Sequence, residues 1–434
     1  FAFSPVMLES VAVISFQAYL FSSLFCLLAL HFFLRSGGGK SPVNYLPFGV
    51  FCLMAFFTKE NAIVLPAVCL AYIFICNRQN FGKNEYQNLN FWVRFKPFIV
   101  ALALCVFAGL FFLFFWLPRF PKQIFSSIFP NISGASTPVM TFYAYINSIF
   151  LSLLHNIKTL LFPFRLSADY SIFVPSNALS VSGIITAVLC AGAAVWLILK
   201  VKNPLIKFLT LFAIIVYLPV SNIVPLINTV NDRYLYFLMV PAALLCAAVL
   251  DILRKQNLQI YKYAVVMIMV MIFIWAFSYR ARGAVFFDNS TVYAEVVRRH
   301  PQNVRGFYNL AISYMISGNH QKALENFQRV QALNPAFNSA EVFFLKGRIY
   351  MHLGNIERAR QNTLSSILFS RSGEHIGYFF NLFETPDDAM LHIINIFENA
   401  VIEKNTLLYF IAYYKSLPDG SKFQIEILRN IVDN

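Results

Sequence analysis

Residues 262–279 read KYAVVMIMVMIFIWAFSY, and this stretch decides how the rest of the chain is interpreted. An α-helix needs about 17–25 mostly apolar residues to cross the hydrocarbon core of a bilayer. The balance of charge changes at the end of the stretch. Residues 1–279 carry 18 Lys and Arg against 6 Asp and Glu, whereas residues 280–434 carry 16 against 14. The sequence therefore predicts a membrane domain that ends here and a nearly neutral soluble tail.

The composition of the whole chain also indicates a membrane protein. Of its residues, 58% are hydrophobic and 12% are charged, about half the charged share of an average soluble domain. This composition excludes an ordinary soluble enzyme and a disordered chain. The formal net charge of +14 comes mostly from the membrane domain, where Lys and Arg normally mark cytoplasmic loops. We therefore expect a lipid bilayer as a partner and no nucleic acid.

Seven or eight apolar stretches are candidates for membrane spans. They lie at 11–34, 44–57, 61–77, 97–117, 181–199, 208–223, 235–253 and 262–279. The stretch 141–164 contains His155, Asn156 and Lys158. Because polar groups are costly at membrane depth, we expect this stretch to lie in the interface, or to enter and return.

Basic residues predict the orientation. The loops at 35–43, 78–96, 200–207 and 254–262 hold twelve Lys and Arg, and the opposite side holds five or six. Because basic loops stay in the cytoplasm, the tail is predicted to lie outside. All seven cysteines precede residue 279 and the tail has none. We expect a bacterial inner-membrane protein with residues 280–434 extracytoplasmic.

The tail carries a repeat signature over residues 304–335, with the spacing of a tetratricopeptide unit. Its matching positions are Leu310, Ala311, Tyr314, Gly318, Ala323, Phe327 and Pro335. A second, degraded copy follows 36 residues later, and its matching positions are Gly347, Tyr350, Gly354 and Ala359. Two interpretations remain open: a packing appendage, or a concave surface that binds an extended polypeptide.

These observations predict an all-α fold in which a polytopic helical membrane domain precedes a short tetratricopeptide α-solenoid. The expected parts are a membrane domain over 1–279, a connecting segment over 280–303, two repeats over 304–375 and a helical cap over 376–434.

Four of the six acids in the membrane domain fall on the predicted outer side, beside Lys59 and Arg233. They are Glu9, Glu60, Asp169 and Asp232. Ionisable groups near membrane depth are usually kept for function or pairing, so they predict the lining of an outward-facing site. The alternative is that Lys59–Glu60 and Asp232–Arg233 are simple interfacial ion pairs.

Group transfer is the chemistry that such a site suits. A carboxylate can deprotonate a hydroxyl acceptor, an Arg or Lys can hold a phosphate, and Tyr234 and Tyr236 can stack on a sugar. The sequence has no Gly-rich phosphate loop, HExxH, GxSxG or Cys/His zinc spacing. We therefore expect no cofactor, and a lipid-linked donor in preference to a soluble nucleotide. The spacing suggests no metal site, and a metal bound by the acids at the outer face stays open.

Four segments resemble motifs of one family. Residues 4–12 (SPVMLESVA) resemble an HPxHxEAV stretch, and residues 58–66 (TKENAIVLP) resemble an SKE(N/T)A…LP hairpin. Residues 161–170 (LFPFRLSADY) resemble an FP…LSxDY segment, and residues 222–236 (NIVPLINTVNDRYLY) resemble NxxP…(D/E)RYLYLP. In this order, and with C-terminal repeats, the motifs resemble those of the bacterial relatives of the transmembrane-and-TPR protein O-mannosyltransferases, which have the GT-C glycosyltransferase fold.

The resemblance implies a polyprenyl-phosphate sugar as donor, a protein hydroxyl as acceptor, an extracytoplasmic site and repeats that engage the acceptor. It implies that Arg233, and less directly Lys59, contact the donor phosphate. Glu9, Glu60, Asp169 and Asp232 would then shape the site, and Tyr170, Tyr234 and Tyr236 would line it.

The chain also departs from the family pattern. Ser4 and Met7 replace the two histidines of the first motif. The family's catalytic acid precedes this motif, so we expect it N-terminal to Phe1 and expect the chain as given to be inactive.

Two alternatives stay open beside the enzyme. One is a non-catalytic, membrane-anchored repeat scaffold for envelope assembly. The other is an oligosaccharide ligase or polymerase, for which we expect a large basic outer loop, whereas 118–140 holds only Arg119 and Lys122. A transporter is disfavoured because no inverted repeat is evident.

Overall fold

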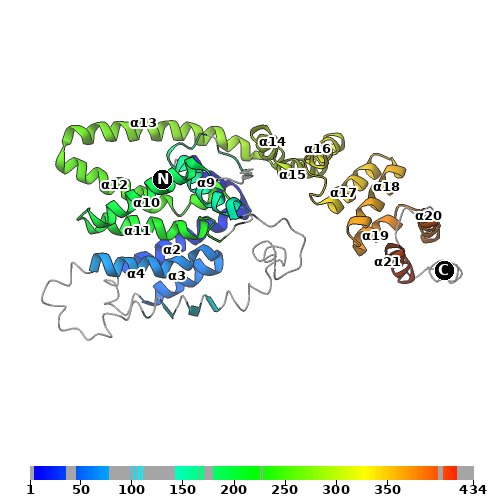
Figure 1. The fold of residues 1–434 in the computed structure, drawn as a ribbon, viewed down its shortest axis with the longest axis horizontal. Coiled ribbons are helices and arrows are strands. Elements are labelled where there is room, and N and C mark those ends of the chain that lie inside the picture. Colours follow the sequence, from blue (N-terminus) through cyan, green and yellow to red (C-terminus); the bar gives the residue numbers. More distant parts are fainter. Residues whose placement is uncertain are drawn as a thin grey trace. The chain divides into compact units, whose positions relative to one another are not determined.

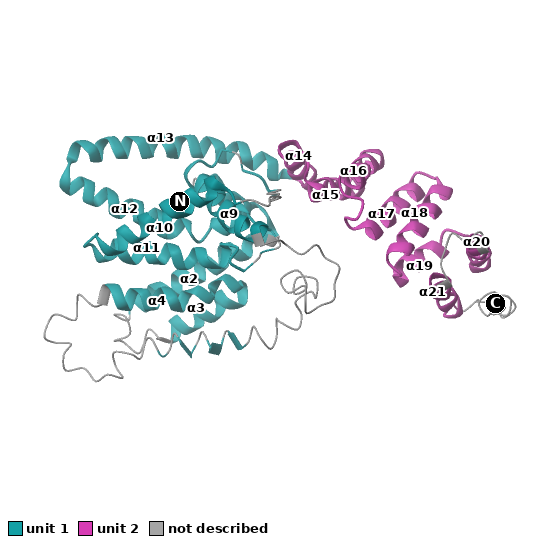
Figure 2. Ribbon diagram, viewed as in Figure 1, with its two compact units in different colours: residues 1–287 teal, residues 288–434 magenta. Residues whose placement is uncertain are grey.

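The computed structural model describes residues 4–35, 45–77, 142–164, 166–170, 179–224, 228–398 and 404–417, with Leu226 and a few helical positions between 99 and 110. The described residues form helices and connecting turns without a strand, so the predicted all-α class is confirmed. The chain divides into two compact units, Phe1–Phe287 and Asp288–Asn434 (Figure 2). Apart from those few positions, the expected span at 97–117 lies outside the described ranges. The loops at 78–96 and 118–140, and the predicted loop 35–43 after Arg35, also lie outside them.

Unit 1 consists of helices that mostly lie alongside one another (Figure 1). Its helical elements are η1 (Pro5–Met7), α1 (Leu8–Ala12), η2 (Ile14–Phe16), α2 (Gln17–Arg35), α3 (Tyr45–Thr58), η4 (Glu60–Val64), α4 (Leu65–Tyr72), η5 (Ile73–Asn77), α9 (Phe142–Leu161), α10 (Val181–Leu199), α11 (Pro204–Tyr217), η9 (Leu218–Val220), η10 (Asp232–Leu235), α12 (Met239–Gln256), α13 (Leu258–Gly283) and η11 (Ala284–Phe287).

Polar caps set several of these boundaries. The side chain of Asn203 accepts a hydrogen bond from the amide of Leu205, with Pro204 at the first helical position, so α11 begins four residues before the predicted stretch 208–223. Asn257 separates α12 from α13 and caps α13 through the amides of Gln259 and Ile260. The helix after this cap is longer than the predicted 262–279.

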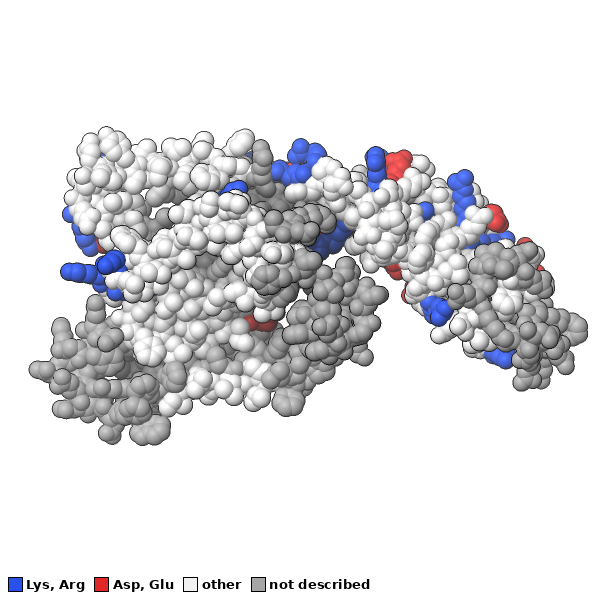
Figure 3. Space-filling view, in the orientation of Figure 1, with Lys and Arg blue, Asp and Glu red and all other residues white. Residues whose placement is uncertain are grey.

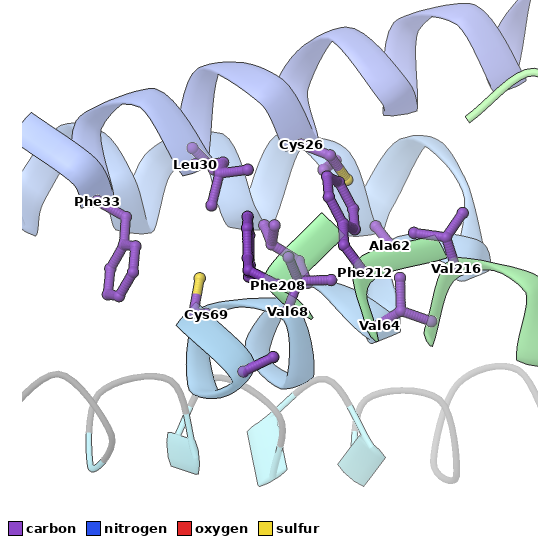
Figure 4. Packing of buried hydrophobic residues seen from close by; sticks show 14 of the residues in the cluster. Cys26, Leu30, Phe33, Ala62, Val64, Val68, Cys69, Phe208, Phe212 and Val216 are labelled. Carbon is purple, nitrogen blue, oxygen red and sulfur yellow. The ribbon is translucent and has the colours of Figure 1, made fainter. Parts of the chain in front are cut away.

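The main core of unit 1 packs α2, α3 and α4 against α11. Phe33 and Leu30 of α2 face Phe208 and Phe212 of α11 (Figure 4). Such close packing fixes how these four helices lie against one another, because protein interiors tolerate few voids. Two of the cysteines, Cys26 and Cys69, are buried here as small apolar groups.

Within the described residues, three helices are long and apolar enough to cross a membrane: Gln17–Arg35, Val181–Leu199 and Leu258–Phe287. The apolar helices of the stretches 44–57, 61–77 and 208–223 are shorter. At a rise of about 1.5 Å per residue, a 14-residue helix such as α3 is roughly 21 Å long, less than the ~30 Å hydrocarbon core.

Charged side chains leave the middle of unit 1 bare. In the space-filling view, Lys and Arg gather at the end where α10 meets α11 and α12 meets α13 (Figure 3). The face beyond is mostly white, with a red patch and a few blue atoms towards the opposite end. The basic residues of these two connections include Lys200, Lys202, Arg254 and Lys255. We call this the basic end of unit 1.

Helix α9 lies across the other end of unit 1. Near its start, Asn147 accepts a hydrogen bond from the amide of Ser180, which precedes α10. Further along, Asn156 donates to the hydroxyl of Tyr217, the last residue of α11, over 3.5 Å. Both parts of α9 thus contact the end opposite the basic one. Its buried polar side chains face the unit, which explains why this stretch lacks the pattern of a span.

Unit 2 is a series of helices from α14 to α21 (Figure 2). They are α14 (Asn289–Arg299), α15 (Val304–Ile316), α16 (His320–Leu333), α17 (Ser339–His352), α18 (Ile356–Phe369), α19 (Gly373–Phe380), α20 (Pro386–Glu398) and α21 (Lys404–Lys415). The predicted connecting segment 280–303 is therefore mostly helical. Asp288 caps α14 with a capping box, in which its side chain accepts from the amide of Thr291.

Candidate functional site

Segments far apart in the sequence meet at the end of unit 1 that α9 crosses. Glu9 comes from α1, Lys59 and Glu60 join α3 to η4, Tyr170 follows α9, and Asp232 and Arg233 open η10. The four quoted motifs thus supply one cluster of polar side chains, which we call the motif cluster.

The centre of the motif cluster is a buried ion pair between Glu9 and Arg233. The Nη1 of Arg233 lies 2.6 Å from Oε1 of Glu9. The backbone amide of Arg233 donates to the other carboxylate oxygen over 3.0 Å. The guanidinium also stacks 3.9 Å above the ring of Phe16. Glu9 is fully buried, so this carboxylate fixes both the backbone and the side chain of Arg233.

A second buried pair holds Asp232. The Nη2 of Arg282, from the end of α13, lies 2.6 Å from Oδ2 of Asp232. The hydroxyl of Tyr170 donates to Oδ1 over 2.7 Å and accepts from the amide of Ser167. The carboxylate of Asp232 therefore links three segments: the start of η10, the end of α13 and the turn that contains Tyr170. Charge-assisted bonds of this kind are the strong ones in proteins.

Burial and neighbouring charges shift the pKa values of the groups in the cluster. Burial raises the pKa of Glu9 to about 7, although the charge of Arg233 opposes this shift. Burial works against a charged Arg233, but Glu9, Tyr234 and Tyr19 together outweigh it and raise the pKa of the guanidinium. Burial also raises the pKa of the Tyr170 hydroxyl, and the charge of Asp232 raises it further. Tyr170 therefore stays a hydrogen-bond donor to Asp232 across the physiological pH range.

Lys59 occupies the more open side of the cluster. Its Nζ lies 2.6 Å from Oε1 of Glu60 and 5.1 Å from the centre of the Tyr19 ring. Tyr19 in turn packs against Tyr234, with ring centres 6.1 Å apart. A cavity of about 20 Å³ lies here, room for roughly one water molecule. Its lining includes Tyr19, Ser22, Ser23, Lys59, Asn61 and Tyr234.

Most of the predicted site residues come together, but not all in the expected roles. Arg233 is occupied by Glu9, whereas Lys59 and Tyr234 border the cavity. Tyr236 packs instead beside an apolar cluster that contains Met7 and Leu235. Two acids flank the cluster: Glu60 is half exposed, and Asp169 is buried, with its carbonyl accepting from Ser167.

Sequence reasoning missed Arg282, Tyr19 and Phe16. Arg282 had a readable signal, since arginines are uncommon on the outer side and two of them follow the last predicted span. Tyr19 and Phe16 gave none, because aromatic residues are abundant throughout this chain. Among the described residues, no three side chains of the metal-ligating types come together.

The helical hairpins of unit 2 have the geometry that the repeat signature predicts. Ala311, Ala323 and Phe327 are fully buried between α15 and α16. Gly318 adopts a φ of +77° at the first turn and Gly354 a φ of +73° at the second, a conformation that glycine adopts without strain. At Gly347 an added Cβ would lie 2.5 Å from Oγ1 of Thr363, which explains the glycine at this helix crossing.

Comparison with known families agrees for this part of the chain. Residues 304–337 and residues 340–362 each match a model of the tetratricopeptide repeat. No curated protein matches the chain. Two tetratricopeptide repeats at 304–362 are therefore confirmed, and repeats of this type generally mediate protein–protein interactions.

Proposed function

We propose that this protein is a membrane glycosyltransferase of the GT-C type. It would move a sugar from a polyprenyl-phosphate donor to a protein hydroxyl on the extracytoplasmic side of a bacterial inner membrane. The observation that carries the proposal is the motif cluster. Two segments that resemble one family's motifs, 224 positions apart, form the buried Glu9–Arg233 pair, and Arg282 pairs with the neighbouring Asp232. A third motif segment donates the Tyr170 hydroxyl to Asp232, and the fourth places Lys59 beside the cavity.

The donor fits the open side of the cluster. Lys59 supplies a cation beside the cavity, and the rings of Tyr19 and Tyr234 supply a surface on which a sugar can stack. We assign the phosphate to Lys59 first. Arg233, whose position is fixed by Glu9, would stabilise the phosphate through its positive charge.

The roles of the carboxylates follow from their partners. Glu9 and Asp232 are each held by an arginine, so we propose that they position the cationic groups and assign the general base to neither. The apolar surface of unit 1 suits the polyprenyl chain. The orientation follows from the basic end, which would face the cytoplasm and leave the motif cluster outside.

The repeats would hold the acceptor. Helical repeats present a concave surface along which an extended polypeptide can lie. In this proposal the unit-2 helices α15 and α17 select the polypeptide, and unit 1 transfers the sugar to its hydroxyl groups.

A transfer assay tests the proposal. Membranes containing the protein expressed from its gene are supplied with radiolabelled polyprenyl-phosphate sugars, and label in protein is measured. We expect Lys59→Gln to raise the KM for the donor by about tenfold, the effect of losing one charge-assisted contact of roughly 1.4 kcal/mol. Lys255→Gln, in an exposed pair at the basic end, is the matched control and should leave transfer unchanged.

A non-catalytic scaffold is the second candidate. It is favoured by the small cavity and by the pairing of Glu9, Asp232, Arg233 and Arg282 among themselves. Well-folded protein that transfers no label from any donor, while still retaining a bound polypeptide, would support the scaffold and exclude the enzyme.

A further inference from the structure

The two repeat turns form one continuous surface of unit 2. α15 ends at Ile316 and α17 ends at His352. The imidazoles of His320 and His352 stack with ring centres 5.2 Å apart, so the two turns lie side by side. We call this surface the turn edge; it comprises Ile316, His320, Lys322, Met351, His352, Leu353, Ile356 and Arg358.

The turn edge exposes large apolar side chains. Ile316 is 77% exposed, and Met351, Leu353 and Ile356 are between 41% and 48% exposed. Leu353 also lines an open hollow of about 440 Å³ over the first turn. Single exposed apolar residues are ordinary, but a group of four around adjoining turns marks an interaction surface.

Cations stand at matching positions of the two repeats on this edge. Lys322 lies over the ring of Tyr314 at 5.4 Å, and Arg358 lies over the ring of Tyr350 at 5.6 Å. Both belong to the first turns of their helices, α16 and α18. Of the neighbouring acids, Glu325 accepts from Gln321 and Glu357 accepts from Gln361. The two cations lie beside the exposed apolar side chains.

Apolar side chains together with Lys and Arg are the combination that binds a bilayer surface, with the apolar groups at the acyl boundary and the cations at anionic headgroups. The chain itself keeps such a surface near. The link between Gly283 and Asn289 is five residues, and its ends lie at most about 20 Å apart. A bilayer that holds α13 therefore lies within reach of unit 2 at all times.

We propose that the turn edge binds the surface of the same bilayer, and that the partner it recognises is anionic lipid. The proposal rests on the membrane insertion of unit 1, which belongs to the proposed function. It leaves the concave side of the repeats free for a polypeptide.

Hydrogen exchange of the full chain in lipid nanodiscs tests this. One copy per disc is compared in phosphatidylcholine alone, in a mixture with phosphatidylglycerol, and in detergent. We expect amides at 316–322 and 351–358 to exchange about fivefold more slowly in the anionic discs than in detergent, and less so in phosphatidylcholine or at high salt.

Variants separate lipid binding from other causes. Ile316→Ser with Leu353→Ser should abolish the protection. Leu391→Ser with Leu408→Ser, which changes apolar residues of similar exposure on α20 and α21, should leave it intact. Equal exchange in discs and detergent, or protection that the first pair does not affect, overturns the turn-edge proposal alone. Protection that requires two copies per disc also overturns it in favour of self-association. A chain that does not enter discs at all overturns both proposals.

Discussion

At the scale of single residues, Glu9 decides the conformation of the motif cluster. It is fully buried and pairs with both the backbone and the side chain of Arg233. Breaking a buried pair by removing one partner costs about 3–5 kcal/mol, because the other charge remains without compensation. We expect Glu9→Gln and Arg233→Met each to lower the free energy of unfolding by this amount.

Replacing both partners removes the uncompensated charge. The double variant should therefore lose far less free energy of unfolding than the sum of the losses in the two single variants. Denaturant titration of the detergent-solubilised protein measures all four states. Asp251→Asn breaks the exposed Lys255–Asp251 pair and should cost less than about 1 kcal/mol. Additive losses in the double variant would show that Glu9 and Arg233 do not interact as described.

The hydroxyl of Tyr170 is the second residue-scale determinant. It donates to Asp232 and accepts from the amide of Ser167. Removing a hydrogen bond to a charged group costs about 1.5–3 kcal/mol, and Tyr170→Phe should destabilise unit 1 by that amount in the same titration. Tyr263→Phe removes an exposed hydroxyl and should be neutral. A neutral Tyr170→Phe would mean that Arg282 alone holds Asp232.

At the scale of elements, the crossing of α17 and α18 depends on Gly347. An added Cβ would meet Oγ1 of Thr363 at 2.5 Å and the carbonyl of Ala359 at 3.2 Å. Overpacking of this kind costs about 1–3 kcal/mol, so Gly347→Ala should speed hydrogen exchange across both helices. Adding Thr363→Ala should recover part of the loss. At Gly373 an added Cβ meets nothing within 4 Å, so Gly373→Ala is the control.

The capping box at α14 makes that helix sensitive to acid. Hydrogen bonds from Ser290 and from the amide of Thr291 lower the pKa of Asp288 below its ordinary 3.8. A carboxylate with a lowered pKa stabilises the folded state above the unfolded pKa, and this stability is lost as the pH falls through the folded pKa. Exchange of the α14 amides should therefore rise below about pH 4 relative to α16. Asp288→Asn keeps a cap and should reduce this dependence. The remainder should come from Glu295, whose pKa is lowered by its bonds to Arg298 and Arg299.

The positions of the helices were largely predictable from the sequence. Their geometry and the burial of their side chains were not. Val181–Leu199 matches its predicted stretch because Ser180 and the following turn bound a uniform apolar run. Residues 61–77 were predicted as one helix but form η4, α4 and a π-helical turn, since periodicity does not distinguish these geometries. Cys246 lies in an apolar stretch and is nevertheless exposed on α12, because an apolar outer surface gives the same sequence pattern as a core.

The ion pairs of the candidate site could not be predicted from the sequence either. Spacing identified Glu9, Asp232 and Arg233 as neighbours at one end, but it did not pair them. The sequence suggested Asp232 with Arg233; the structure pairs each with a partner from another segment, Arg282 and Glu9. Pairing depends on which segments meet, and that is decided by packing between elements 224 positions apart.

At the scale of the whole molecule, the orientation depends on α9. If α9 lies across one end of unit 1, the α10–α11 connection is cytoplasmic and the end of α13 is outside. If α9 crosses the bilayer, every segment after it has the opposite orientation, relative to the segments before it, from the one predicted here. The contacts at Asn147 and Asn156 both involve the end away from the basic connections, which favours a helix parallel to the membrane surface.

Reporter fusions distinguish these topologies in cells. Alkaline phosphatase, which is active only outside the cytoplasm, should be active when fused after Phe142, after Leu161 and after Gly283. A green fluorescent protein fused after Lys202 should fluoresce, because that protein matures in the cytoplasm. Opposite reports at Phe142 and Leu161 would show that α9 crosses. Cytoplasmic reports after Leu161 and after Gly283 would contradict the placement of the motif cluster outside the cytoplasm.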